Sequence, residues 1–447
     1  MADTPSDDRL AAAAVEEALY ARIGEATPKP RLEATRRAVE LLGDPQRMYG
    51  VIHIAGTNGK TSTARITESL LRSHGLRVGL MTSPHLNRLS ERIVIDGEPI
   101  SDRLLAENWA DVEPFLQIVD AELLANSEPP LTFYEALTVL TFACFADAPV
   151  DVAVIEVGMG GEWDATNVVV ADVAVLTPIA MDHAEFLGDT IREIARTKAG
   201  IVKPASRVVS AVQSEDAMDE ILRACTLSEA TLRVMGRDFY LLNTESAVGG
   251  QMISVSGIAG EYRNLGLPLF GDYQADNAAL AIAAVESFLG NGEIPLGAEV
   301  VEDGILLSSS PGRLQVIDHH PTVILDAAHN PHSAEALCRA IMGSFSFSRL
   351  ICVLGILQEK DVIGIVEALD PVVDHFVVTQ SQSDRAISVS DLADTVSAIA
   401  GPDRVDSRGD VDSALERAKE LSGVEGGVLV TGSITLIGEV RGGSKHG

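Results

Sequence analysis

A chain of 447 residues is long enough for two or three domains, and 46% of the residues are hydrophobic, so substantial cores can form. Its 34 basic side chains are outnumbered by 65 acidic ones, which gives a net charge of -31 at pH 7. A surface of that sign repels nucleic acid and argues against a DNA or RNA partner. Any anionic substrate therefore needs a local positive site of lysine, arginine or backbone amide groups.

Cysteine usage and the N-terminus bear on the cellular location. The four cysteines are scattered without a C-x-x-C pair, which argues against a zinc ribbon or a disulfide framework. The first residues, MADTPSDDRLAAAAVEEAL, lack the basic start and the long apolar stretch of a signal peptide. No segment approaches the ~20 apolar residues of a membrane-spanning helix. We expect reduced thiols, a cytoplasmic protein and no membrane partner.

Apolar runs alternate with helical patterns in the first part of the chain. Runs typical of parallel strands buried on both faces lie at 51–56, 151–158 and 171–179, and a further strand candidate lies within 203–212. Helical patterns occupy 60–75, 130–148, 191–201 and 274–290. The segment 236–266 looks more antiparallel and predicts a small additional sheet.

A second series of strands follows the Ser-Pro-Gly stretch at 308–312, which is the best domain boundary on composition. Its strand-like runs lie at 322–331, 349–356, 375–380 and 427–433, with helical segments between them. This order predicts two α/β domains with mostly parallel sheets. We expect a large ATP-binding domain over residues 1–308 and a smaller, Rossmann-like domain over residues 309–447.

The stretch HIAGTNGKTSTARI, between the first strand and the next helix, looks like a phosphate-binding loop without its first glycine. Gly56 and Gly59 let backbone N–H groups turn toward phosphate oxygens, and the helix start adds its dipole. Lys60 would reach the outer phosphates, and Thr61 or Ser62 could offer a hydroxyl to magnesium. The alternative is a plain turn with a surface lysine, but the strand and helix around the loop favour a nucleotide site.

In this setting, GTNGKTS resembles the short phosphate loop of the Mur ligase superfamily, ATP-dependent enzymes that join a carboxylate to an amine. A GTPase loses ground because no N-K-x-D motif follows. The resemblance implies a catalytic role for Lys60. It also implies ATP binding by the loop residues Gly56, Thr57, Asn58, Gly59, Lys60, Thr61 and Ser62.

Further stretches resemble the folylpolyglutamate synthase/dihydrofolate synthase branch of that superfamily. In TSPHLNRLSERI the resemblance implies that Ser83 is a magnesium ligand, although a serine-proline pair is also ordinary turn chemistry. For LTFYEALT and VIEVGMGGEWDATNVV it implies a site for the pterin ring of a folate, formed by Thr132, Phe133, Tyr134, Glu135, Trp163, Asp164 and Ala165. For any one residue of LTFYEALT, a buried helix is an equally good interpretation.

Three further residues, Glu156, His183 and Lys198, are expected to be metal ligands. Glu156 ends an apolar strand near the phosphate loop, where an acid that coordinates nucleotide-bound magnesium should lie. His183 and Lys198 resemble the family's ligands for a second magnesium ion, with the lysine carbamylated by carbon dioxide, and both are predicted to be catalytic. A desolvated lysine has the lowered pKa that this reaction needs. The alternatives are a structural histidine and a salt-bridged lysine.

Residues on both sides of the predicted boundary are implied to contact ATP. The motif GDYQADN offers Asn277, PGRLQ offers Arg313 for phosphate, and DAAHNP offers Asp326 and His329. We therefore expect the two domains to close over the nucleotide.

The resemblance extends over roughly residues 30 to 440 and implies a bifunctional dihydrofolate synthase/folylpolyglutamate synthase. In that family the carboxylate of dihydropteroate or of a folate attacks the γ-phosphate of ATP, and the amine of L-glutamate then displaces phosphate. We expect a monomer that binds these small molecules. We expect no covalent nucleophile in the mechanism, since Cys144 lies in an apolar helix and is predicted to be a core residue.

Three positions depart from the family pattern, and two alternatives stay open. Glu162 stands where the family has arginine, Thr197 where it has glutamate, and Tyr273 where it has histidine. One alternative is a Mur ligase that acts on a cell-wall precursor, against which TSPHL and LTFYEAL argue. The other is a non-catalytic ATP-binding regulator, for which Glu162 and Thr197 are the only sequence hints.

Overall fold

The computed structural model describes residues 7–24 and 29–443, which fold into two compact units. The N-terminal unit comprises the chain up to Leu242 together with Ser254–Leu265 and Asn277–Ser308. The C-terminal unit comprises Asn243–Ile253, Gly266–Asp276 and the chain from Ser309 onward. The assignment of residues 1–308 and 309–447 to two domains stays a prediction. Its outermost residues, 1–6 and 444–447, lie outside the described part.

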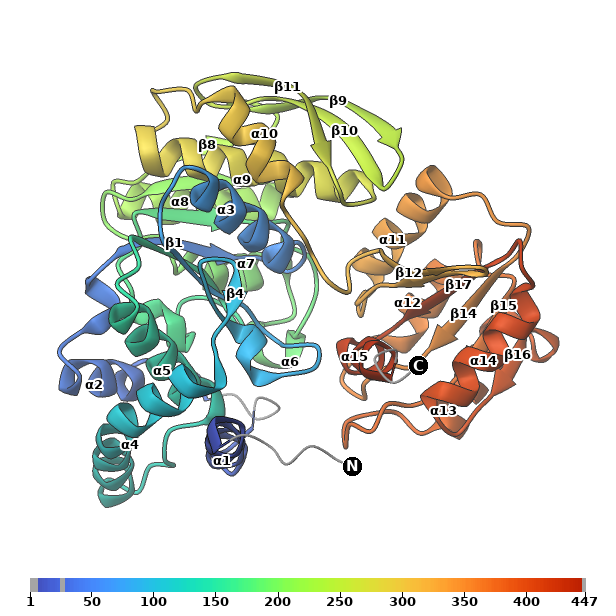
Figure 1. Cartoon of the computed structure of the whole chain (residues 1–447), viewed down its shortest axis with the longest axis horizontal. Helices are drawn as coiled ribbons and strands as arrows, with labels where there is room; N and C mark the ends of the chain where they lie inside the picture. Colours follow the sequence, from blue (N-terminus) through green and yellow to red (C-terminus); the bar gives the residue numbers. More distant parts are fainter. Residues whose placement is uncertain (1–6, 25–28, 444–447) are drawn as a thin grey trace. The chain divides into compact units, whose positions relative to one another are not determined.

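An eight-stranded sheet forms the centre of the N-terminal unit, in the order β4-β3-β2-β5-β1-β6-β7-β8 (Figure 1). Its strands are β1 (Gly50–Ala55), β2 (Val78–Met81), β3 (Ile93–Ile95), β4 (Glu98–Pro99), β5 (Val152–Glu156), β6 (Val173–Leu176), β7 (Arg207–Ser210) and β8 (Thr231–Val234). The six strands from β2 to β8 in this order are parallel, and only β3 and β4 pair antiparallel. The prediction of a mostly parallel sheet is confirmed.

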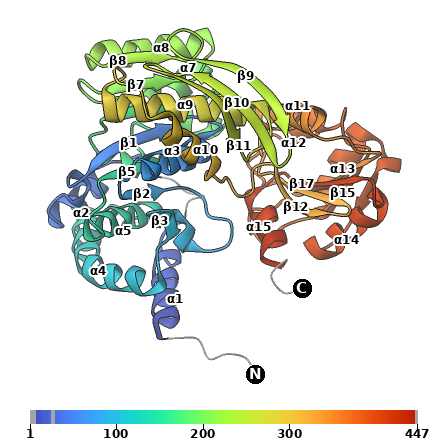
Figure 2. The same ribbon diagram turned by 45° about the horizontal axis from the view of Figure 1, so that its top comes forward.

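Helices cover both faces of this sheet. They are α1 (Asp7–Tyr20), α2 (Glu33–Leu41), α3 (Lys60–Ser73), α4 (Asp102–Ala125), α5 (Phe133–Asp147), α6 (Ala184–Leu187), α7 (Ile191–Ala199), α8 (Glu215–Leu227) and α10 (Ala298–Leu306). One core cluster packs α1, α2, α4 and α5 on β5, and another packs α7 and α8 on β6 and β7. Figure 2 shows α3 and α10 on the other side of β1 and β2 from α4 and α5. Apolar strands buried between such layers explain the continuous apolar runs of the sequence.

A separate three-stranded sheet has the order β11-β10-β9, with strands β9 (Tyr240–Ala247), β10 (Gly250–Ser256) and β11 (Glu261–Leu267). Only two residues join β9 to β10 and four join β10 to β11, and connections this short require antiparallel neighbours. The small additional sheet expected over 236–266 is therefore present. The helix α9 (Asp272–Gly290) follows it.

The C-terminal unit contains a six-stranded sheet in the order β12-β13-β17-β14-β15-β16. All neighbours are parallel except β12 with β13. The strands are β12 (Gln315–His319), β13 (Thr322–Leu325), β14 (Leu350–Leu354), β15 (His375–Val378), β16 (Val405–Ser407) and β17 (Gly427–Thr431). The helices are α11 (Pro331–Ser344), α12 (Val362–Leu369), α13 (Val389–Ala400), α14 (Val411–Ser422) and α15 (Ile434–Gly443). The prediction of a second, mostly parallel sheet with helical segments between its strands is confirmed.

Two further expectations concern membrane-spanning helices and the cysteines. In the described part of the chain, no helix is long and apolar enough to cross a membrane. All four cysteines are buried and free. Cys144 belongs to the core cluster around α5, and burial raises the pKa of its thiol, so the prediction that it is a core residue is confirmed.

Candidate active site

The predicted phosphate loop lies between the end of β1 and the start of α3, at the centre of the large sheet. Gly59 has a φ of 85°, and a Cβ there would lie 2.5 Å from Asn277 Oδ1. A Cβ on Gly56 would collide with the side chain of Thr177. The turn is therefore too tightly packed for side chains at either glycine.

Backbone amides of the loop are divided between two uses. The N–H groups of Thr57 and Asn58 donate to Pro178 O, at 3.0 and 3.3 Å, and so fix the loop to the chain after β6. The first helical bond of α3 runs from Thr63 N to Gly59 O. Hence the amides that precede Thr63 in the first turn of α3 are the ones suited to phosphate oxygens.

Glu156 joins three elements at the carboxyl end of β5. Its side chain is buried, and the register places it beside Ile54 of β1. Thr61 Oγ1 donates to Glu156 Oε1 at 2.8 Å, and Ser83 N donates to Glu156 Oε2 at 3.2 Å. The structure thus brings together three of the residues expected at a nucleotide-bound magnesium ion.

Two lysines converge on the carbonyl oxygen of Gly56. Lys60 Nζ donates to it at 3.1 Å and also to Thr57 O at 3.1 Å, and Lys198 Nζ donates to it at 2.8 Å. Lys198 is buried in the last turn of α7, and this burial, with a smaller contribution from the charge of Lys60, lowers its pKa to about 7. A large fraction of Lys198 is therefore a neutral, nucleophilic amine near neutral pH.

His183 lies at the start of α6, with a left-handed backbone (φ 52°). Its Nε2 is 3.7 Å from Asp182 Oδ2. The carboxylate of Asp182 opposes the lowering of the Lys198 pKa, so this segment lies within Coulombic reach of Lys198. Across residues 7–24 and 29–443, no three His, Cys, Asp or Glu side chains group closely enough to hold a metal ion on their own.

The start of α5 is fixed by charged and capping contacts of Glu135. Glu135 N donates to Thr132 Oγ1, and Thr132 N donates to Glu135 Oε2, which forms a capping box. Arg31 donates to both carboxylate oxygens, at 2.8 and 2.9 Å. Glu135 and Thr132, both expected at the pterin ring, thus stabilise the local chain in this structure.

The two aromatic side chains at the start of α5 have different neighbours. Phe133 stacks against Tyr20, with ring centroids 5.3 Å apart and planes 10° apart. Tyr134 Oη donates to Glu156 O at 3.5 Å. The segment expected to bind the acceptor therefore reaches the strand end that carries Glu156.

Asp164 organises the loop that follows β5. Its carboxylate accepts from Met159 N at 2.9 Å, from Thr166 N at 3.0 Å and from Thr166 Oγ1 at 2.5 Å. Burial outweighs these bonds and raises the pKa of Asp164. Trp163 packs beside Gly160, and Ala165 is buried in the turn after Asp164. The structure places these residues together, and their contact with a pterin stays a prediction.

The remaining expected nucleotide residue of the N-terminal unit is Asn277. Its amide oxygen accepts from Thr63 Oγ1 at 3.3 Å, and it packs against Gly59. Asn277 is thus adjacent to the phosphate loop.

Asp326 is a buried predicted site residue of the C-terminal unit. Its buried carboxylate accepts from Leu314 N at 2.8 Å, from Ala328 N at 2.9 Å and from Tyr273 Oη at 3.4 Å. Burial raises the pKa of Asp326, and the charge of Arg313 opposes that rise. Tyr273, one of the departures from the family pattern, therefore has a defined partner.

His329 and Asn330 lie where β13 leads into α11. His329 Nδ1 is 2.8 Å from Ala327 O, and Asn330 caps α11 by accepting from Ser333 N at 2.9 Å. The carboxyl ends of parallel strands are the usual place for ligands in such sheets. The nucleotide contact of His329 stays a prediction.

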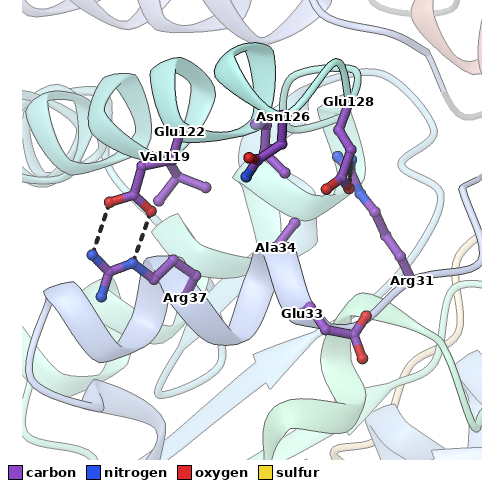
Figure 3. Close-up of a pocket in the computed structure, with 9 residues that line it drawn as sticks. Arg31, Glu33, Ala34, Arg37, Val119, Glu122, Asn126 and Glu128 are labelled. Carbon is purple, nitrogen blue, oxygen red and sulfur yellow. Dashed lines mark hydrogen bonds and ion pairs between the residues drawn. The ribbon is translucent and has the colours of Figure 1, made fainter.

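A pocket between α2 and α4 is lined by both acidic and basic side chains (Figure 3). Its lining residues are Arg31, Glu33, Ala34, Arg37, Val119, Glu122, Leu123, Asn126 and Glu128. Arg31 is paired with Glu135, and Arg37 donates to both oxygens of Glu122, at 2.8 and 2.9 Å (Figure 3). Since both cations are compensated by carboxylates, the phosphate loop is the better candidate for an anionic substrate.

Comparisons with known proteins agree with this geometry. Residues 54–285 match the Mur ligase middle domain, and residues 312–434 match the Mur ligase, glutamate ligase domain. A dihydrofolate synthase/folylpolyglutamate synthase of Mycobacterium tuberculosis is 41% identical, over 98% of this chain and 95% of that protein. The chain belongs to the dihydrofolate synthase/folylpolyglutamate synthase family. The predictions of family, of fold class and of a ligase are confirmed.

Solved structures of this family have the same fold. The Mycobacterium tuberculosis folylpolyglutamate synthase complexed with ADP is 41% identical and covers 98% of each chain, with a TM-score of 0.93. Escherichia coli FolC in complex with DHPP and ADP is 30% identical, with a TM-score of 0.86 over 97% of this chain and 98% of that one. These relatives do not favour the alternative of a Mur ligase for cell-wall precursors.

Two departures from the dihydrofolate synthase/folylpolyglutamate synthase pattern are neighbours in space. Glu162 N donates to Thr197 O at 2.7 Å. Thr197 Oγ1 donates back to Glu193 O, within its own helix. Nothing in the structure explains the charge reversal at Glu162, whose side chain is exposed.

Sequence reasoning missed three side chains that support the site. Arg31 pairs with Glu135, and Arg92 lies with its guanidinium carbon 5.2 Å from the centroid of Phe133. His53 is fully buried in β1, where its Nε2 is 2.8 Å from Thr166 Oγ1. A histidine in an otherwise apolar strand was a signal for a buried polar network. Arg31 and Arg92 carried no comparable signal, because their partners are distant in sequence.

Proposed function

We propose that the chain joins L-glutamate to dihydropteroate and to folates in an ATP-dependent reaction. The acceptor carboxylate attacks the γ-phosphate of ATP, and ADP leaves. The amine of glutamate then attacks the acyl carbon of the acyl phosphate, and inorganic phosphate leaves. Acidic composition supports the absence of a nucleic-acid partner, and we take the chain to act as a cytoplasmic monomer.

One observation carries this proposal: the phosphate loop and the acceptor segment meet at the end of β5. Thr61 and Ser83 contact the carboxylate of Glu156, and Tyr134 contacts the carbonyl oxygen of the same residue. A carboxylate bound along α5 would therefore lie beside the phosphates held by α3. Such positioning is the main contribution of a protein to phosphoryl transfer.

The residues at this point suit a magnesium ion. Hard cations take oxygen ligands, and magnesium usually keeps several waters and substrate phosphates besides one or two protein groups. Glu156, Ser83 and Thr61 offer such oxygens and would hold the ion. When bound, magnesium neutralises the charge that develops on the phosphoryl oxygens.

We infer a second cation site at Lys198 and His183. The neutral amine of Lys198 attacks carbon dioxide, forms an N–C bond and loses a proton to solvent, which converts the neutral amine into a carbamate anion. The lowered pKa supports this reaction, because only the neutral amine is nucleophilic. The carbamate oxygens and His183 would then hold the ion, with Lys60 directed to phosphate.

Glutamate-dependent ADP release tests the proposed function. Dihydropteroate and tetrahydrofolate are supplied in parallel with ATP and magnesium, and we expect turnover with both. Glu156→Gln removes the charge of the carboxylate but keeps its shape, so turnover should fall at least a hundredfold. Binding of ATP without any turnover of the wild type would instead support a non-catalytic regulator.

A further inference from the structure

Three residues that follow β6 lie beyond the ladder that joins β6 to β7: Thr177, Pro178 and Ile179. The last main-chain bond between the two strands runs from Ala211 N to Leu176 O, at 2.9 Å. Pro178 has no N–H group with which the ladder could continue. A side chain from the loop between β7 and α8 bonds to the chain at this point instead.

That side chain is Gln213, which bonds the segment through both ends of its amide. Its Nε2 donates to Thr177 O at 3.0 Å, and its Oε1 accepts from Ile179 N at 3.0 Å. The same Nε2 is 3.4 Å from Leu176 O and from Ser210 Oγ. A residue of a parallel strand bonds its neighbour in this way, at a carbonyl and an N–H group two residues apart. The amide of Gln213 therefore acts as one further peptide group at the end of β7.

The carbonyl oxygen of Pro178 faces the phosphate loop, on the side away from Gln213. It accepts from Thr57 N at 3.0 Å and from Asn58 N at 3.3 Å. The side chain of Thr57 adds a second anchor, because its Oγ1 donates to Ala180 O at 3.0 Å and accepts from Ala180 N at 3.1 Å. Both the amide and the hydroxyl of Thr57 thus hold the loop to the chain after β6.

Close packing joins the position of this segment to that of the loop. A Cβ at Gly56 would lie 1.8 Å from Thr177 Oγ1, and Thr177 N donates to Ala55 O at 2.9 Å. The segment and the turn are in direct contact, so a displacement of one displaces the other. Backbone N–H groups bind a phosphate only when they point toward it. The direction of the loop amides therefore depends on what holds residues 177–179.

We propose that Gln213 is a positioning residue for nucleotide binding: through residues 177–179 it keeps the phosphate loop in the arrangement that accepts the phosphates of ATP and ADP. This inference rests on the proposed function only in taking this loop as the nucleotide site. Without the amide, the loop is in that arrangement for a smaller fraction of the time, and the apparent affinity falls by that fraction. Loss of two hydrogen bonds corresponds to about a tenfold change.

Substitutions at Gln213 test the proposal through the binding of ADP with magnesium, measured by calorimetry, and through the KM values. Gln213→Met keeps the length of the side chain but removes both hydrogen bonds, so we expect the dissociation constant of ADP and the KM for ATP to rise about tenfold. Gln213→Asn keeps the amide but is too short to reach both partners, and it should weaken ADP binding as well. The KM values for glutamate and dihydropteroate should stay within about twofold.

Asn108→Leu is the matched control for a loss of stability. Asn108 is buried, and its Nδ2 donates to Leu104 O at 3.0 Å and to Asp147 Oδ2 at 3.4 Å, in α4 and at the end of α5. The variant also loses the hydrogen bonds of a side-chain amide, yet it should bind ADP within about twofold of the wild type. A merely structural role of Gln213 would lower the amount of folded, active protein without changing the affinity for ADP.

The outcomes separate this inference from the proposed function. Wild-type affinity for ADP in either Gln213 variant would overturn it, and so would an equal loss of ADP affinity in Asn108→Leu. Gln213 is partly exposed, so both of its variants should fold. Calorimetry with ADP needs no acceptor, and a wild type that binds ADP but joins no glutamate therefore contradicts the proposed function alone. A wild type that does not bind ADP contradicts both.

Discussion

Lys60 and Lys198 donate to the same carbonyl oxygen, that of Gly56, although they come from different helices. One positive charge next to another, inside a buried site, favours loss of a proton from the more buried amine. That amine is Lys198, with a pKa of about 7. The residue that we propose to become a carbamate is therefore the more buried of the two, and the more accessible Lys60 is left for phosphate in this proposal.

Removal of Lys198 provides a test of the carbamate. We expect Lys198→Ala to lose nearly all ligation, because the second cation site loses its carboxylate-like ligand. A short carboxylic acid such as acetate or propionate should restore part of the activity, since it can occupy the space of the missing carbamate. Methylamine serves as the control of similar size and should restore none. Full activity of Lys198→Ala without any additive would contradict the carbamate.

Because His53 is buried, we predict that the stability of the fold changes with pH. Its burial lowers the pKa from 6.5 to about 3, so the folded chain keeps it neutral while the unfolded chain protonates it below pH 6.5. The unfolded state then binds more protons, and stability falls as pH falls from 6.5 toward 3. Between pH 6.5 and 5 the free energy of unfolding falls by about 2 kcal/mol for this reason. Above pH 6.5 both states are neutral, and the contribution is constant.

The variant His53→Gln isolates this effect, because glutamine keeps an N–H donor for Thr166 but does not titrate. We expect its free energy of unfolding to fall by about 2 kcal/mol less than that of the wild type between pH 6.5 and 5. Urea unfolding followed by tryptophan fluorescence reports the N-terminal unit, since both tryptophans, Trp109 and Trp163, belong to it. Parallel pH dependences of the two proteins would contradict the prediction.

At the scale of elements, helix α5 depends on a pair of charges that sequence could not reveal. The motif LTFYEALT predicted a helix, yet the partner of Glu135 is Arg31, which lies 104 positions away. Side-chain exposures of 13% for Arg31 and 5% for Glu135 make this a buried pair. Breaking such a pair leaves an uncompensated charge inside the fold.

We predict that Glu135→Ala lowers the free energy of unfolding of the N-terminal unit by about 3 kcal/mol, through the lost pair and the lost cap. Glu122→Ala is the matched control, because Glu122 pairs with Arg37 in the same region but both side chains are nearly half exposed. Exposed pairs contribute little, so the control should lose much less stability. Urea unfolding would contradict the prediction if the two variants lost the same amount.

At the scale of the whole molecule, the sequence predicted the elements near the site better than the contacts between them. Continuous apolar runs identified β1, β5 and β6, and glycines at 56 and 59 identified the loop, because strand burial and tight turns leave local signals. The exchange of segments between the two units left no such signal. Nor did the stacking of Tyr20 on Phe133, since long-range packing is not encoded in local periodicity.

The central claim is that this chain activates an acceptor carboxylate as an acyl phosphate. The most direct measurement uses dihydropteroate with ¹⁸O in both carboxylate oxygens, together with ATP, glutamate and magnesium, and analyses the phosphate released. Attack of the carboxylate on the γ-phosphate predicts that one labelled oxygen per turnover appears in inorganic phosphate and the other stays in the amide product. Release of unlabelled phosphate alongside the amide product would contradict the account.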